Sequence, residues 1–255
     1  RAALDLPMPE AIQPLHAALQ ALSTALALCA RLSGTGAFDD LLRDGHTLIE
    51  ALDDARRWDA LAGETLASHI DALAGVADVA ALGDAAAAAR LESHRRVRAL
   101  LDGPLPQRVL LGLAFLVSQP RWRGDEGAIS KRLAAKFRVR TRREIARLDK
   151  RLQDRGKAIR RLAEEAQQEM HGDVRHLAAV MDLVGPLWPR PRRFRRYEER
   201  LDALQSALDG LHEARMTQQG LNRIAEEELS PAVQRAVGAI GGWSVRDRTE
   251  RLSKL

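Results

Sequence analysis

Apolar residues recur at helical spacing through most of this sequence, and this pattern constrains the fold more than any other feature. In the first segment they fall three or four residues apart and therefore lie on one face of an amphipathic helix, at Ile12, Leu15, Leu19, Leu22, Leu26 and Cys29. No window shows the sustained alternation of apolar and polar residues that a half-buried strand requires. The sequence therefore predicts an all-α fold of about eight to ten helices and no sheet.

Glycine and proline clusters mark where the predicted helices should end, because these residues favour turns over helix interiors. They occur at 33–36, 103–106, 119–127, 185–191 and 238–242. The chain has 255 residues, of which 45% are hydrophobic and 29% charged. It can therefore bury a substantial core, which excludes disorder of the whole chain.

The longest apolar runs, such as residues 109–117, are shorter than the roughly 20 residues of a membrane-spanning helix, so no membrane span is expected. The start, Arg-Ala-Ala-Leu-Asp, shows neither an initiator methionine nor a signal-peptide pattern, which predicts a trimmed chain. The single cysteine, Cys29, excludes an intrachain disulfide and fits a small core position. We therefore expect a cytoplasmic protein.

The positive charge is concentrated in one part of the chain. Residues 1–90 carry 6 basic and 13 acidic side chains, whereas residues 91–255 carry 34 and 22. The segment 129–162, predicted as one long helix or two helices kinked near Gly156, carries 14 basic and only 3 acidic groups. A solvated helix usually interleaves the two signs, because like charges four residues apart repel. This segment therefore favours a polyanion-binding site over a merely solvated face.

The chain also resembles itself at an offset of about 155 residues. Leu15-His16 falls on Met170-His171, and three leucines that follow fall on Leu177, Met181 and Leu183. At an offset of 156, residues 48–53 correspond to residues 204–209, with Arg56 falling on His212. This weak repetition predicts two related halves.

These features resemble the conserved histidine alpha-helical domain, or CHAD, family. In that family each half opens with a helix that carries a histidine followed by basic residues, and later carries a Gly-x-x-Arg-Asp-x-Asp-Val-Leu motif. Residues 52–61 resemble the first copy of this motif, keeping Arg56, Asp59 and Leu61, with Arg57 in place of the first Asp. Residues 204–214 resemble the second copy, and the basic helix 134–157 and the ending 183–188 also match. The resemblance covers about residues 9 to 228.

The chain departs from the family pattern in its first half. After His16 the family carries arginines, whereas this chain has Ala17-Ala18-Leu19-Gln20-Ala21, so we expect a reduced contribution of the first half to a basic site. After His171 the pattern is better kept, by Arg175 and His176.

The resemblance implies a single domain over residues 1–255. It would contain two helical bundles related by a pseudo-twofold axis, with approximate halves 9–118 and 128–228 and a C-terminal extension 229–255. It further implies a basic groove that binds inorganic polyphosphate, in a domain that occurs alone, on polyphosphate granules, or beside a phosphate-processing enzyme such as a CYTH triphosphatase. The Glu-x-Glu-x-Lys strand of that enzyme does not occur in these 255 residues.

Resemblance and charge together select a set of candidate polyphosphate-binding residues. Arginine suits this role because its planar fork can give two charge-assisted hydrogen bonds to one phosphate. The candidates are Lys136, Arg140, Arg143, Arg147, Lys150, Arg151, His171, Arg175 and His176, with a possible second contact at Arg192, Arg193, Arg195 and Arg196.

Catalytic and metal-binding motifs are not recognisable in the sequence. There is no phosphate-cradling glycine loop, nucleophile elbow or Cys-x-x-Cys pair. His171 and His176 stand five residues apart with no carboxylate spaced to complete a metal triad. We therefore expect a binding module that is not an enzyme and needs no metal or cofactor.

Two alternatives remain open at this level. The same basic helix could bind nucleic acid, with Phe194 and Tyr197 stacking on bases in their arginine-rich setting. Alternatively, the chain could be a degenerate accessory domain that has lost ligand binding and supports a neighbouring enzyme, as the altered first half suggests.

Overall fold

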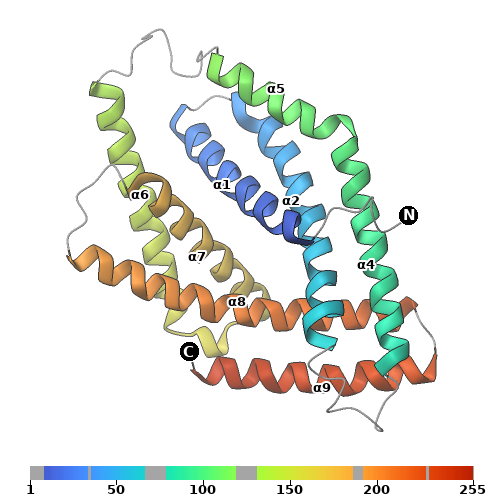
Figure 1. Cartoon of the computed structure of the whole chain (residues 1–255). Helices are drawn as coiled ribbons and strands as arrows, with labels where there is room; N and C mark the ends of the chain where they lie inside the picture. Colours follow the sequence, from blue (N-terminus) through green and yellow to red (C-terminus); the bar gives the residue numbers. More distant parts are fainter. Residues whose placement is uncertain are drawn as a thin grey trace. The chain divides into compact units, whose positions relative to one another are not determined.

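The computed structural model describes residues 9–33, 36–66, 79–118, 131–185, 192–227 and 230–254. Within these ranges it contains eight α-helices and no strand, so the predicted all-α fold is confirmed. Figure 1 shows these helices, which are α1 (Pro9–Ser33), α2 (Asp39–Asp59), α4 (Val79–Asp102), α5 (Pro104–Ser118), α6 (Lys131–Gly156), α7 (Glu164–Val184), α8 (Arg192–Glu227) and α9 (Pro231–Lys254). Short 3₁₀ or π turns lie at η2 (Gly36–Phe38), η3 (Ala60–Thr65) and η5 (Ile159–Arg161).

Most predicted breaks coincide with helix ends. Helix α1 ends at Ser33, α4 ends at Asp102 just before α5 begins at Pro104, and α7 ends at Val184. The long basic segment contains α6, which ends at Gly156, and then the η5 turn. The predicted break at residues 119–127 lies outside the described residues.

The predicted break at residues 238–242 is wrong, because α9 runs through all three glycines. Ile240 of this stretch is buried in a hydrophobic core together with Ala236 and Val237 just before it, and Ala239 packs against that core. Each interior glycine costs a helix about 1 kcal/mol relative to alanine. Tertiary burial of the apolar residues between the glycines outweighs this local penalty.

Residue contacts divide the chain into two compact units. Unit 1 comprises Arg1–Ala17, Leu48–Gly103 and Gly210–Leu255, and unit 2 comprises Ala18–Thr47 and Pro104–Asp209. Helices α1, α2 and α8 each have residues in both units. The halves predicted from the sequence rest on repetition along the chain, and a division by contacts does not test such repetition. The two halves and the pseudo-twofold axis therefore stay predictions.

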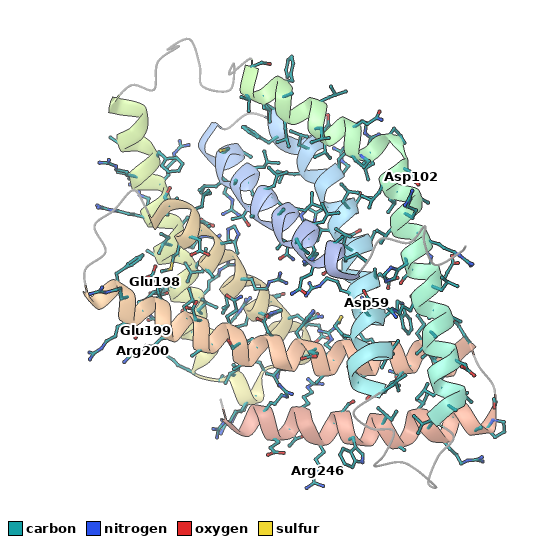
Figure 2. The ribbon with its side chains drawn as sticks, in the orientation of Figure 1. Asp59, Asp102, Glu198, Glu199, Arg200 and Arg246 are labelled. Atoms are coloured by element: carbon teal, nitrogen blue, oxygen red, sulfur yellow. The ribbon has the colours of Figure 1, made fainter. Side chains whose placement is uncertain are left out.

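Unit 1 is built around the packing of α4 against α9. Its core includes Trp58 and Leu61, together with Leu82 of α4, Leu221 of α8 and Ile240 of α9. Asp59, labelled in Figure 2, ends α2 and binds α4 through Arg90 Nε at 2.6 Å and His94 Nε2 at 2.9 Å. This carboxylate therefore ties α2 to α4 beside the core.

Unit 2 is built around the packing of α6 along α7, which lie side by side in Figure 1. Leu28, Val180 and Val184 form a buried cluster, against which Phe137 and Ile145 of α6 pack. Helix α5 is joined to the first half of α2 by two hydrogen bonds from Arg108 to the Asp44 carboxylate, of 3.0 and 2.6 Å. The basic helix α6 is thus fixed along one side by apolar contacts.

One helical stretch, Ala11–Arg31 of α1, is long and apolar enough to cross a membrane by length and composition alone. The pair α4 and α5 meets the same criterion only if it is counted as one broken span. Core helices of soluble proteins and signal sequences near the N-terminus also pass such a test, and 22% of this stretch is buried inside the protein. The length of uninterrupted apolar runs in the sequence did not identify this stretch as a candidate membrane span.

Candidate functional site

Helix α6 has one buried face and one basic face. Thr141, Leu148 and Leu152 are buried at helical spacing, and the Thr141 hydroxyl donates a hydrogen bond of 2.9 Å to the carbonyl of Phe137. Arg140, Arg143 and Arg147 follow the same period on another face and are exposed. The 3.6-residue repeat of the helix therefore gathers the predicted cations along one side.

A pocket of about 220 Å³ lies in unit 2, where the end of α1 meets α6. Its lining is strongly basic and consists of Leu28, Arg31, Arg140, Arg143, Glu144 and Arg147. Arg140 Nη1 also donates a hydrogen bond of 3.1 Å to the carbonyl of Arg31, near the C-terminus of α1. Three residues predicted from the sequence therefore line one pocket.

Glu144 is the acidic member of this lining, and its side chain is only 13% exposed. Arg147 donates two hydrogen bonds to its carboxylate, Nε to Oε2 at 3.1 Å and Nη2 to Oε1 at 2.7 Å. Arg31 Nη1 also donates to Oε1. The hydrogen bond from Arg147 and the charge of Arg31 hold the pKa of Glu144 below its ordinary 4.5, although burial opposes the shift.

His176 of α7 lies beside this cluster, with its Nε2 atom 3.8 Å from Glu144 Oε1. Burial and the nearby Arg31 charge lower the pKa of His176 below its ordinary 6.5. The imidazole is therefore neutral at pH 7, where it can donate or accept a hydrogen bond but adds no charge.

Two other predicted residues pair with neighbouring helices rather than lining the pocket. Arg151 Nη2 donates a 2.6 Å hydrogen bond to Asp173, and Arg155 Nη1 donates one of 2.8 Å to the same carboxylate. Arg175 donates a hydrogen bond to the side chain of Gln20. Arg151 and Arg175 thus hold helices together within unit 2.

His171 is 6% exposed, and its Nε2 atom lies 2.6 Å from Asp209 Oδ1 on α8. His16, at the aligned position of the first half, is 2% exposed and places Nε2 2.7 Å from Asp53 Oδ1 on α2. Both histidines and both aspartates fall on the offsets found in the sequence. The two aligned segments therefore share one contact, in which a buried histidine on one helix pairs with an aspartate on another helix. We call this pair the histidine–aspartate clamp.

The possible second contact lies at the start of α8. Arg195 and Arg196 are exposed, while the side chains of Arg192 and Arg193 lie outside the described residues. The Tyr197 hydroxyl donates a 2.7 Å hydrogen bond to Asp149 of α6, and burial raises the pKa of this phenol. Two acidic residues, Glu198 and Glu199, follow at once on the same helix (Figure 2). Tyr197 thus joins α8 to α6, and its hydroxyl is already engaged there.

The remaining candidates contribute less to the pocket. Lys150 is exposed on α6, and the side chain of Lys136 lies outside the described residues. Among the described residues no group of three or more His, Cys, Asp or Glu side chains could hold a metal ion.

Sequence reasoning missed two charged lining residues, Arg31 and Glu144. Arg31 is the basic residue in the last turn of α1 and lies 109 positions before Arg140, so no local pattern connects them. Glu144 stood out only as one of three acids in a basic segment. The first half of the sequence thus contributes Arg31 to the pocket, although residues 17–21 carry no arginine.

Comparison with known proteins identifies the class of domain. The family model described as the CHAD domain matches residues 2–222, so the chain belongs to the CHAD domain family. A crystal structure of the CHAD domain from the plant Ricinus communis is similar in fold, with a TM-score of 0.74 and 20% sequence identity. The match covers 97% of this chain and 83% of the plant domain. No curated protein matches significantly.

Proposed function

We propose that this CHAD domain is a binding module for inorganic polyphosphate, which it contacts through the arginine pocket at the end of α1 and the basic face of α6. The observation that carries the proposal is the lining of this pocket, where Arg31, Arg140, Arg143 and Arg147 face the same space. Polyphosphate is a line of closely spaced negative charges without bases to stack. A row of guanidinium groups provides the charge-assisted hydrogen bonds that such a ligand needs.

The module acts by binding and carries out no reaction of its own in this proposal. Arg143 is the best-placed contact, because it is exposed and forms no ion pair within the described part of the chain. His171 and Arg151, which already bind aspartates, stabilise the helices that present the pocket. A cytoplasmic location, on polyphosphate granules or beside a phosphate-processing enzyme, belongs to the same proposal.

The proposal is tested by binding of labelled long-chain polyphosphate to the wild-type chain and to Arg143→Glu. Hydrogen bonds between charged groups contribute about 1.5–3 kcal/mol, so reversing this charge should weaken binding about ten- to a hundredfold. The matched control is Arg95→Glu on α4 in unit 1, where Arg95 is 62% exposed and lies 3.8 Å from Glu92. The control should change affinity by about twofold or less.

Two results would count against this function. Equal losses in the two variants would mean that only net charge matters, and complete displacement by duplex DNA or single-stranded RNA would favour a nucleic-acid-binding protein. In the nucleic-acid alternative, Phe194→Ala should also weaken binding, whereas polyphosphate has no base to stack on that ring.

A further inference from the structure

The arginine pocket already contains an anion of its own, the carboxylate of Glu144. Both oxygens of this group accept hydrogen bonds from Arg147, and Oε1 also accepts one from Arg31. Glu144 is 13% exposed and is followed one turn later by the buried Leu148, so the backbone of α6 holds it in place.

The Nε and Nη2 atoms that Arg147 uses for Glu144 form one of the two nitrogen pairs through which a guanidinium can hold a phosphate in a bidentate contact. Arg31 Nη1 likewise donates a hydrogen bond to Oε1 of the Glu144 carboxylate. A phosphate group that enters the pocket would face Arg140 and Arg143 on the lining but would meet Glu144 at Arg31 and Arg147. Two anions that share one set of donors repel each other.

We propose that Glu144 competes with phosphate groups for Arg31 and Arg147 and thereby limits the affinity of this pocket for its anionic ligand. The inference rests on the proposed function, since it names a residue that tunes the same site. Glu144 favours ligands with several linked phosphates, because these can hold Arg140 and Arg143 while competing for the other two arginines. A single phosphate cannot bind Arg140 and Arg143 and at the same time compete for Arg31 and Arg147.

The alternative role for Glu144 is positioning. In that case the carboxylate would hold Arg31 and Arg147 in a geometry that helps the ligand, and its loss would weaken binding. The two roles predict opposite signs for the same substitution, which makes the inference testable with one measurement.

The test compares the wild-type chain with Glu144→Gln, which keeps the shape of the side chain and removes its charge. We expect Glu144→Gln to bind long-chain polyphosphate about tenfold more tightly, because the repulsion inside the pocket is lost. The matched control is Glu169→Gln on α7, since Glu169 is also paired with an arginine, Arg155, but lies outside the pocket. The control should alter affinity by about twofold or less.

A second variant, Glu144→Ala, guards against an effect specific to glutamine, and helical circular dichroism shows whether each variant is folded. Unchanged or weaker binding by both folded variants would overturn the inference and leave the proposed function intact. An equal gain in Glu169→Gln would also overturn it, because net charge alone would then explain the effect. Failure of the wild-type chain and of every variant to bind polyphosphate would overturn the proposed function together with the inference.

Discussion

Two buried histidines play the same part in the two halves of the sequence. His171 donates from Nε2 to Asp209, and His16 donates from Nε2 to Asp53 while Arg56 Nη1 lies 3.0 Å from its Nδ1. A carboxylate can only accept a hydrogen bond, which assigns the Nε2 proton in both rings. The histidines that signalled the family in the sequence therefore lie within the packed helices and bind aspartates there.

This arrangement predicts that the clamp contributes to stability. Asp209→Ala leaves the Nε2–H group of the 6% exposed His171 without its partner, and this should lower the free energy of unfolding by about 1–3 kcal/mol. Asp209→Asn keeps an acceptor oxygen at the same place and should cost less. Urea denaturation followed by circular dichroism measures both differences, and equal costs for the two variants would refute the clamp.

At the scale of single elements, tertiary packing decides whether a helix continues through its glycines, as α9 does. The sequence predicted a break at residues 238–242, yet the apolar residues of α9 fit the core of unit 1 and the helix continues. The pattern of glycine and proline clusters located most helix ends correctly, because these residues weaken helices through local backbone effects. It failed in α9 because burial, which is not local, outweighed that weakness.

Two glycine substitutions should have opposite effects on stability. A Cβ atom at Gly238 of α9 meets nothing within 4 Å, so Gly238→Ala should stabilise unit 1 by about 0.5–1 kcal/mol. A Cβ atom at Gly220 of α8 would lie 2.9 Å from Leu61 Cδ2, in a well-packed core, so Gly220→Ala should destabilise the unit by about 1–3 kcal/mol.

Thermal unfolding measures both glycine variants, with the wild-type chain as reference. A lower melting temperature for Gly238→Ala, or a higher one for Gly220→Ala, would show that the free space around these two glycines does not decide the effect of an added methyl group.

At the scale of the whole molecule, charge is distributed unequally between the compact units. Unit 1 contains 14 basic and 18 acidic residues, a formal charge of −4, whereas unit 2 contains 26 and 17, a charge of +9. The arginine pocket lies in the positive unit. Under the proposed function, an anionic ligand would therefore be attracted to unit 2 by its overall field as well as by contacts in the pocket.

This charge distribution predicts a steep dependence of polyphosphate binding on salt. Each phosphate neutralised by a cation releases counterion, so the logarithm of the association constant should fall with the logarithm of salt concentration, by about 0.7–0.9 per contact. Arg143→Ala should reduce this slope by about one, whereas Arg95→Ala should leave it nearly unchanged. Fluorescence polarisation over a series of KCl concentrations measures the slopes, and identical slopes for the two variants would exclude the pocket as the main contact.

The sequence by itself determined the helical class, most helix ends, the family and the concentration of cations on α6. The helical class, the helix ends and the cation pattern follow from local propensity and from a period of 3.6 residues, which operate over a few turns of one helix. The family follows instead from the resemblance of the sequence to known motifs. The tertiary structure alone decided that Arg31 lies beside Arg140, that Glu144 takes up the donors of two arginines, and that Arg151 and His171 bind aspartates of other helices. These contacts join residues far apart in the chain, and they depend on how buried faces pack, which no local spacing encodes.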